Sequence, residues 1–183
     1  AMVDGSLSLM SFFYSLKEMG HWVDKRESNL LDGFAHFYDT YECSDNKFLA
    51  VGSIEPQFYS ELLDKLGIEE DKFKDQHNKD LWPELKNIMS SKIKSKSRSE
   101  WIEIFKDSDA CVSPVLSMEE AKKHPHNIER EAFINIDGFN QPNASPRYSV
   151  TKQEIKHNAK QVGADLDDIC KEFNLSIDAL KKT

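Results

Sequence analysis

A strand that runs directly into a helix is the most constraining feature of this sequence. From Phe48 to Ile54 the side chains alternate between two faces, which is the period-two pattern of a pleated strand. Pro56 then stands at a first helical position, where its missing N–H is tolerated, and Gly67 supplies a left-handed helix end. The apolar residues between them have helical spacing: Phe58, Leu62, Leu63 and Leu66. We expect the rest of the chain to be organised around this unit.

Glu55 lies at the junction of this strand and this helix, in the N-cap position. Asp, Asn and Ser are the preferred residues there, and the longer Glu is a poor substitute. A carboxylate that departs from local preference at the end of a strand is a candidate functional residue. The plain alternative is an exposed cap that also favours the helix dipole, and the residues by themselves favour this alternative.

The composition describes a folded protein with room for one domain or two small ones. The chain has 183 residues, of which 39% are hydrophobic and 31% charged. The net charge of −8 argues against a nucleic-acid partner, and no apolar run approaches the length of a membrane span. Three scattered cysteines, Cys43, Cys111 and Cys170, fit free thiols in a reducing compartment better than a disulfide framework.

The middle of the chain predicts an α+β fold, with a small antiparallel β-hairpin or three-stranded sheet and packed helices. Two strands, at 35–42 and 47–54, are expected to pair across a turn at Ser44-Asp45-Asn46. Helices are expected from Pro56, from near Trp82 and after the capping box Ser97-x-x-Glu100. A last strand, 111–116, contains Pro114 and is therefore expected to lie at a sheet edge or to end there.

The two flanks are less regular. Residues 2–16 predict a well-buried helix with more apolar surface than the following residues cover, so we expect this chain to be the C-terminal part of a longer protein. The C-terminal flank begins with a capping box at Ser117-x-x-Glu120. Its further expected elements are a bend at His124-Pro125-His126, a strand at 132–136, a loop at 140–146, and helical pieces around Leu166–Phe173 and Ile177–Leu180, the second of them capped by Ser176.

Two further motifs carry weaker signals. His124-x-His126 resembles part of a zinc site, but no third ligand is placed by spacing, so we predict no metal. The basic run of Lys92, Lys94, Lys96 and Arg98 could contact phosphates, but such runs are more often solvated helix ends. The sequence has no glycine-rich phosphate loop and no G-x-S-x-G elbow.

Several segments together resemble the alpha-methylacyl-CoA racemases, in family order from the start of the chain to about Phe133. The matching segments are Leu30-Leu31-Asp32-Gly33, Phe37-Tyr38-Asp39-Thr40-Tyr41, Ala50 to Tyr59, Trp82-Pro83-Glu84-Leu85, Lys96 to Trp101, Asp109 to Leu116 and His124-Pro125-His126-Asn127. The sequence departs from the family at Phe34 and His36, where the family has Gly and Pro next to the expected pocket.

The resemblance implies a fold and an organisation. Racemases of the class III CoA-transferase superfamily are intertwined homodimers with a large Rossmann-like domain and a smaller α+β domain. By this resemblance, residues 1–34 are the end of a large-domain helix and a linker. Residues 35–116 are the small domain, and residues 117–183 are a returning segment with C-terminal helices.

The resemblance also implies a chemistry, the inversion of the carbon α to a CoA thioester through an enolate. The family's acid and base are a His and an Asp, which by this resemblance fall upstream of Ala1, so the fragment alone is expected to be inactive. Glu55 matches the family glutamate that pairs with the catalytic His. The resemblance therefore favours a functional role for Glu55 over the helix cap that the residues alone favour. Tyr38, Ile54 and Leu31 are expected to line the acyl pocket.

The remaining expectations also follow from the resemblance. The acyl-CoA is the substrate, and no cofactor, metal, nucleic acid or membrane partner is expected. The expected location is mitochondrial or peroxisomal. Two alternatives stay open: a class III CoA-transferase, and a non-catalytic protein that binds acyl-CoA or acts as an interaction partner.

Overall fold

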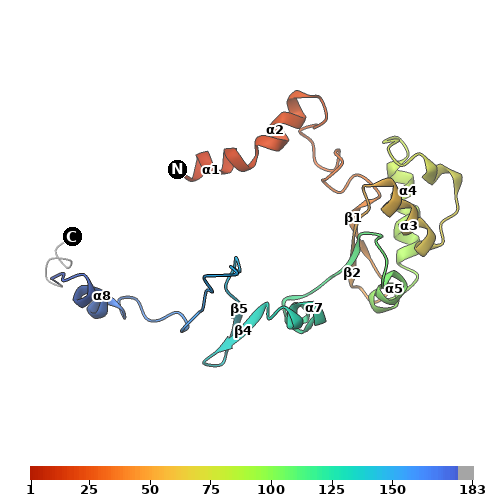
Figure 1. Cartoon of the computed structure of the whole chain (residues 1–183). Helices are drawn as coiled ribbons and strands as arrows, with labels where there is room; N and C mark the ends of the chain where they lie inside the picture. Colours follow the sequence, from red (N-terminus) through yellow and green to blue (C-terminus); the bar gives the residue numbers. More distant parts are fainter. Residues whose placement is uncertain (177–183) are drawn as a thin grey trace. The chain divides into compact units, whose positions relative to one another are not determined.

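The computed structural model describes residues 1–176 of the chain (Figure 1). The chain divides into two compact units, the first Ala1–Leu116 and the second beginning at Ser117. The finer division into 1–34, 35–116 and 117–183 stays a prediction.

The first unit contains, among the described residues, a three-stranded antiparallel sheet in the order β1 (Tyr38–Glu42), β2 (Phe48–Gly52) and β3 (Val112–Val115). Tyr38 pairs with Gly52 across the hairpin, and Ala50 pairs with Ser113 on the other side of β2. The predicted α+β class, the hairpin and the edge position of the last strand are thus confirmed. In the turn Asn46 adopts a φ of 57°, a conformation that Asn tolerates.

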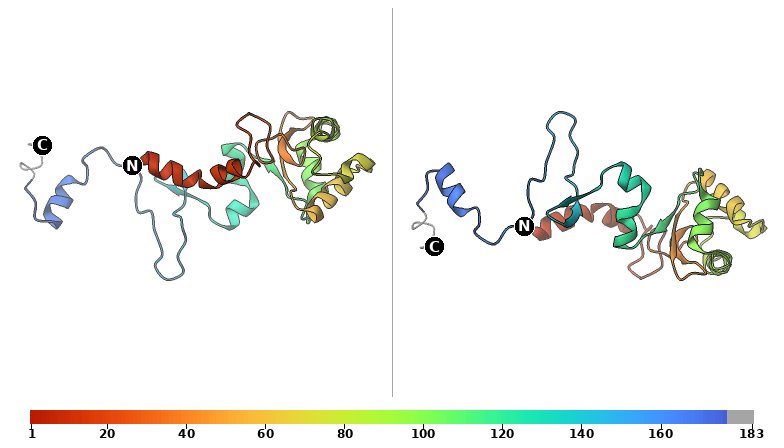
Figure 2. Two further views of the ribbon diagram at one scale, coloured as in Figure 1. Left: turned by 90° about the horizontal axis from the view of Figure 1, so that it is seen from above. Right: turned by 90° about the horizontal axis from the view of Figure 1, so that it is seen from below.

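Helices α3 (Pro56–Leu66), α4 (Trp82–Ile93) and α5 (Arg98–Phe105) lie on one side of this sheet in Figure 1 and in both views of Figure 2. The predicted alternation in β2 explains why they pack there. Leu49 and Val51 point to the helices and are 0% and 4% exposed, whereas Phe48 on the opposite face is 43% exposed. One face of the sheet therefore belongs to the core, and the other is open.

The local signals that define these helices act as predicted. Gly67 ends α3 with a φ of 64°, and Ser97 and Glu100 form a capping box that opens α5. A short 3-10 helix, η1 (Asp71–Lys74), lies between α3 and α4. The two fully buried tryptophans, Trp82 and Trp101, each donate their indole N–H to a backbone carbonyl, so their burial leaves no donor unpaired.

His36 is also part of this core. Its side chain is 0% exposed and packs edge to face against Phe37, Tyr59 and Phe73. Its Nε2 lies 2.7 Å from the Tyr59 hydroxyl, which donates to the carbonyl oxygen of Phe73. No partner for Nδ1 is found in the described part of the chain. Burial lowers the pKa of His36 to about 4, and the charge of His77 contributes to this shift.

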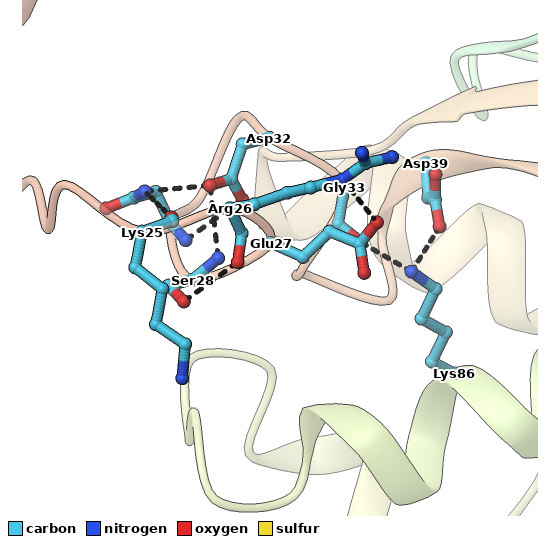
Figure 3. Close-up of polar contacts among 9 residues, drawn as sticks. Lys25, Arg26, Glu27, Ser28, Asp32, Gly33, Asp39 and Lys86 are labelled. Atoms are coloured by element: carbon cyan, nitrogen blue, oxygen red, sulfur yellow. Dashed lines mark hydrogen bonds and ion pairs between the residues drawn. The ribbon is translucent and has the colours of Figure 1, made fainter.

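A loop of residues 23–33 precedes β1 and is held by its own polar side chains (Figure 3). Asn29 is 1% exposed, accepts a hydrogen bond from Val23 N–H at 2.7 Å and donates to Asp32 at the same distance. Asp32 also accepts the backbone N–H groups of Ser28 and Asn29. Burial alone would raise the pKa of Asp32, but these hydrogen bonds outweigh it and lower the pKa, so the carboxylate stays charged.

Gly33 ends this loop in a conformation that needs glycine. Its φ is 86°, in the left-handed region, and a Cβ built there would lie 3.2 Å from Oδ1 of Asp39. A side chain at this position would meet both backbone strain and a close contact.

The N-terminal flank differs from the prediction of one buried helix. Residues 2–18 form two helices, α1 (Met2–Leu9) and α2 (Ser11–Glu18), separated at Met10, and neither helix contains a buried residue. Leu9 is 84% exposed and Phe12 57% exposed, while Phe13 packs against Trp22 with ring centroids 5.0 Å apart. The prediction of burial is wrong for the described residues, because few apolar groups of the chain reach these helices.

The second unit contains α6 (Met118–Lys123), α7 (Pro125–Glu129), a hairpin of β4 (Phe133–Ile136) and β5 (Phe139–Pro142), and α8 (Leu166–Glu172). The capping box at Ser117 and Glu120 is confirmed. The predicted bend at 124–126 is instead the start of α7, because Pro125 suits a first helical position.

The predicted loop at 140–146 is wrong in its first part, which forms β5. Asp137 and Gly138 adopt φ values of 51° and 86° and turn the chain tightly between the two strands. The predicted helix around Leu166–Phe173 is confirmed as α8, and the predicted helix around Ile177–Leu180 lies outside the described residues, so the cap predicted at Ser176 stays a prediction.

The burial of His36 predicts an acid-sensitive core. Because its folded pKa of about 4 lies below the unfolded value of 6.5, the unfolded state takes up a proton first as the pH falls. The stability contributed by the neutral ring is complete above pH 6.5 and is lost towards pH 4, by roughly 3 kcal/mol in total. Urea unfolding of the parent and of His36→Gln between pH 7.5 and about 4 measures this difference.

His21→Gln, which removes an exposed imidazole that is not among the groups shifting the pKa of His36, is the matched control and should keep the pH dependence of the parent. Equal pH dependence in the parent and in His36→Gln would contradict the buried neutral histidine.

Gly33→Ala is expected to destabilise the first unit by about 2 kcal/mol, because the left-handed conformation and the approach of Asp39 both penalise a Cβ. Gly67→Ala is the control: its φ is 64°, but its Cβ would meet only the flexible end of Lys92 at 3.5 Å. This control should cost about 1 kcal/mol, which is the backbone strain alone. Free energies of unfolding in urea compare the two variants, and equal losses would show that the contact with Asp39 has no effect.

Candidate functional site

A hollow of about 460 Å³ lies on the open face of the sheet, beside the 23–33 loop. Its floor and walls come from three parts of the first unit: the end of the loop, the start of β1, and β2 with the segment leading into β3. The lining residues are Leu31, Asp32, Gly33, Tyr38, Asp39, Thr40, Ala50, Val51, Gly52, Cys111 and Ser113. The small residues of β2 leave the space that the hollow occupies.

Two of the predicted pocket residues, Leu31 and Tyr38, line this hollow. Ile54 does not line it and lies half-buried just beyond the end of β2. The backbone of this strand end is fixed by Gln76, whose side-chain amide donates to the carbonyls of Ser53 and Ile54, each at 3.0 Å. These hydrogen bonds therefore hold the backbone next to Glu55 in a defined position.

Glu55 is the N-cap residue of α3, with a φ of −74° and a ψ of 141°. Its side chain is exposed and makes no capping hydrogen bond to the described helix. The plain explanation of Glu55 as a helix cap thus lacks its hydrogen bond. The carboxylate is available for a contact with another group. The hydrogen-bonded end of β2 fixes the backbone position from which the Glu55 side chain extends.

Cys111 connects Glu55 with the hollow. It lines the hollow, is exposed, and accepts a hydrogen bond from Gly52 N–H through its carbonyl. Partial burial raises the pKa of its thiol, and the carboxylates of Glu55, Asp109 and Glu61 raise it further, so the thiol stays protonated near neutral pH. The sequence reasoning missed Cys111, because only the pairing of β3 with β2 brings it to the hollow.

The polar groups of the hollow limit its chemistry. The carboxylate of Asp32 is committed to the hydrogen bonds of the 23–33 loop, and that of Asp39 pairs with Lys86 at 2.5 Å. The described residues around the hollow therefore offer an apolar binding surface, with the exposed carboxylate of Glu55 near Cys111 beyond the end of β2. Transfer of a proton on two faces of a substrate would need groups from elsewhere.

The departures from the resembling family fall in the core and not in the hollow. His36 is fully buried, and Phe34 packs against Trp82 with ring centroids 5.3 Å apart. Neither residue lines the hollow.

The basic run has structural partners. Lys94 forms an ion pair with Glu42 at 2.9 Å, and the ammonium of Lys96 lies 5.7 Å from the ring centre of Trp101. Arg98 is largely buried and donates to a backbone carbonyl of β3. These contacts favour the structural interpretation of the run over a phosphate site.

No group of three or more His, Cys, Asp or Glu side chains with metal-binding geometry occurs among residues 1–176. In the same described range, no helix has the length and apolarity to span a membrane.

Comparison with known proteins relates this geometry to a family. The chain is 40% identical over 179 residues to alpha-methylacyl-CoA racemase of Mus musculus, which covers 96% of this chain and 47% of that protein. It is 42% identical over 146 residues to alpha-methylacyl-CoA racemase of Homo sapiens, with 80% of this chain and 37% of that protein covered. The chain thus spans less than half the length of the curated relatives that it matches.

Among solved structures, the fold is similar to the crystal structure of Rv3272 from Mycobacterium tuberculosis, with a TM-score of 0.67 at 14% identity. The likeness covers 90% of this chain and 43% of that chain and concerns the fold alone. The sequence model of CoA-transferase family III matches residues 1–166. This chain therefore belongs to CoA-transferase family III.

Proposed function

We propose that this chain is part of an isomerase that inverts the α carbon of 2-methyl-branched acyl-CoA thioesters. The observation that carries the proposal is the identity of 40% with a racemase along 96% of the chain. In the proposed reaction a base removes the α proton, the electron pair forms an enolate on the thioester, and an acid returns a proton to the opposite face. The thioester is the substrate, and no cofactor is required.

The residues of this chain are assigned to binding and to support of the base. Leu31 and Tyr38 in the hollow, with Ile54 beside it, are proposed to contact the acyl group. Glu55 is proposed to hold a catalytic histidine by a hydrogen bond, which is supported by its exposed carboxylate at a fixed strand end. The histidine and the aspartate that exchange protons are proposed to lie in the half of a longer protein that the racemases have and this chain does not span.

The whole enzyme is further proposed to be a homodimer in mitochondria or peroxisomes. The strongest alternative is a CoA-transferase of the same family, which would pass CoA between carboxylic acids; the name of the matching family favours it. A non-catalytic acyl-CoA-binding protein is the remaining alternative.

The experiment uses a chimera in which this chain replaces the matched 47% of the mouse racemase. In D2O the chimera is expected to incorporate deuterium at C2 of a 2-methylacyl-CoA and to scramble its configuration. The chain alone is expected to incorporate none, because it lacks the acid and the base. Glu55→Gln in the chimera should lower the exchange rate about 10²-fold, since the base loses its orienting partner. Mass spectrometry of the recovered thioester gives the rates.

Glu103→Gln, an exposed change on α5, is the matched control and should exchange at the parent rate. Circular dichroism and size-exclusion chromatography establish that each chimera is folded. Transfer of CoA to an added free acid without exchange would replace the proposal by the transferase. A folded chimera that binds the thioester but shows neither reaction would leave a binding protein, and exchange by the chain alone would contradict the assignment of the acid and base to the missing half.

A further inference from the structure

Lys86 of α4 joins the 23–33 loop to the sheet by a single ammonium group (Figure 3). Its Nζ lies 2.5 Å from the carbonyl oxygen of Gly33, at the end of the loop. It also lies 2.5 Å from Oδ2 of Asp39, in the first half of β1. The side chains of Lys86 and Asp39 are 31% and 20% exposed, so the pair is screened by water less than a surface ion pair.

The two residues that Lys86 connects both line the hollow, one from the loop and the other from β1. Gly33 follows Leu31 by two residues and carries the end of the loop, which forms one wall. Asp39 lies between Tyr38 and Thr40, which line the hollow from β1. One ammonium group therefore ties the end of the loop, which forms a wall of the hollow, to β1.

The geometry around Asp39 allows little variation in this distance. Its Oδ1 accepts the backbone N–H of Thr40 at 2.8 Å, which orients the carboxylate so that Oδ2 faces Lys86. The close approach of Gly33 to Oδ1 leaves no room for a side chain at that position. We call the Gly33 carbonyl, the Asp39 carboxylate and the Lys86 ammonium the loop clamp.

We propose that Lys86 is a positioning residue that sets the width of the hollow and thereby the acyl groups that the hollow accepts. Lys86 does not itself line the hollow, and it acts through Gly33 and Asp39. The positioning role rests only on the contacts of Lys86 with Gly33 and Asp39, whereas the effect on acyl selection rests on the function proposed above. The two parts are therefore tested separately.

The positioning role is tested in the 183-residue chain with Lys86→Met, which keeps the length of the side chain and removes the ammonium. We expect amide hydrogen exchange to accelerate about tenfold in residues 23–33 and to stay unchanged in α4 and β2. N-ethylmaleimide should modify Cys111 several-fold faster, because the loop no longer narrows the hollow. Of the three cysteines, Cys43 and Cys170 are buried, so the fast labelling reports on Cys111.

The matched control is Lys92→Met, which removes a second α4 ammonium that contacts a backbone carbonyl, that of Gly67, away from the hollow. It should leave loop exchange and Cys111 labelling at parent values. Lys86→Arg keeps a donor for both oxygens and should restore most of the loop protection. Equal loop exchange in Lys86→Met and in the control would overturn the positioning role, whether or not any chimera is active.

Acyl selection is tested in the chimera with a series of 2-methylacyl-CoA thioesters of increasing chain length. Lys86→Met should raise KM at least fivefold for the shortest acyl group, leave kcat within twofold, and reduce the difference in KM between short and long acyl groups. A uniform loss of kcat with unchanged chain-length preference would overturn the selection. Absence of exchange in the unsubstituted chimera would count against the proposed function and not against the loop clamp.

Discussion

Burial of one face of β2 beneath α3, α4 and α5 is the constraint on which the first unit depends. Leu49 and Val51 are nearly inaccessible to water, and full burial of such side chains contributes roughly 1.5–3 kcal/mol each. Because successive side chains of a strand point to opposite faces, the same register turns Ala50 and Gly52 towards the hollow. A slip of one residue would exchange the two sets and fill the hollow with larger side chains. The core and the candidate site are therefore determined by a single register.

The wall of the hollow is held by polar contacts that the core does not supply. The 23–33 loop has its own hydrogen-bonded centre in Asn29 and Asp32, and it meets the sheet where Lys86 contacts Gly33 and Asp39. Packing fixes the floor, and charge-assisted hydrogen bonds fix the wall above it. A change in a charged residue can therefore alter the shape of the hollow while the apolar core stays intact. The shape of the site and the stability of the core thus depend on different residues.

Local signals account for the parts of the fold that the sequence predicts correctly. The period of two in β2, Pro56 and Gly67 around α3, and the capping box at Ser97 act within a few residues, so they can be recognised without the structure. The buried helix predicted at residues 2–16 failed because burial depends on partners that no local pattern reveals. Leu31 and Tyr38, which line the hollow, were predicted as acyl-pocket residues through the family resemblance, and that role stays a prediction. Cys111 and Lys86 reach the hollow or its wall only through contacts between distant segments.

The distribution of acidic groups supports a division of labour in the proposed enzyme. Inversion of a carbon requires one group that takes a proton and another that returns it from the opposite face. Near the hollow, Asp32 and Asp39 are bound into the loop and the clamp, and the thiol of Cys111 is kept protonated by its raised pKa. Glu55 is exposed, but one carboxylate can exchange a proton with only one face of the substrate carbon. In the proposed enzyme, the described residues are thus suited to binding the acyl group and orienting a base, and the proposed proton-transferring pair is a second, separate set of residues.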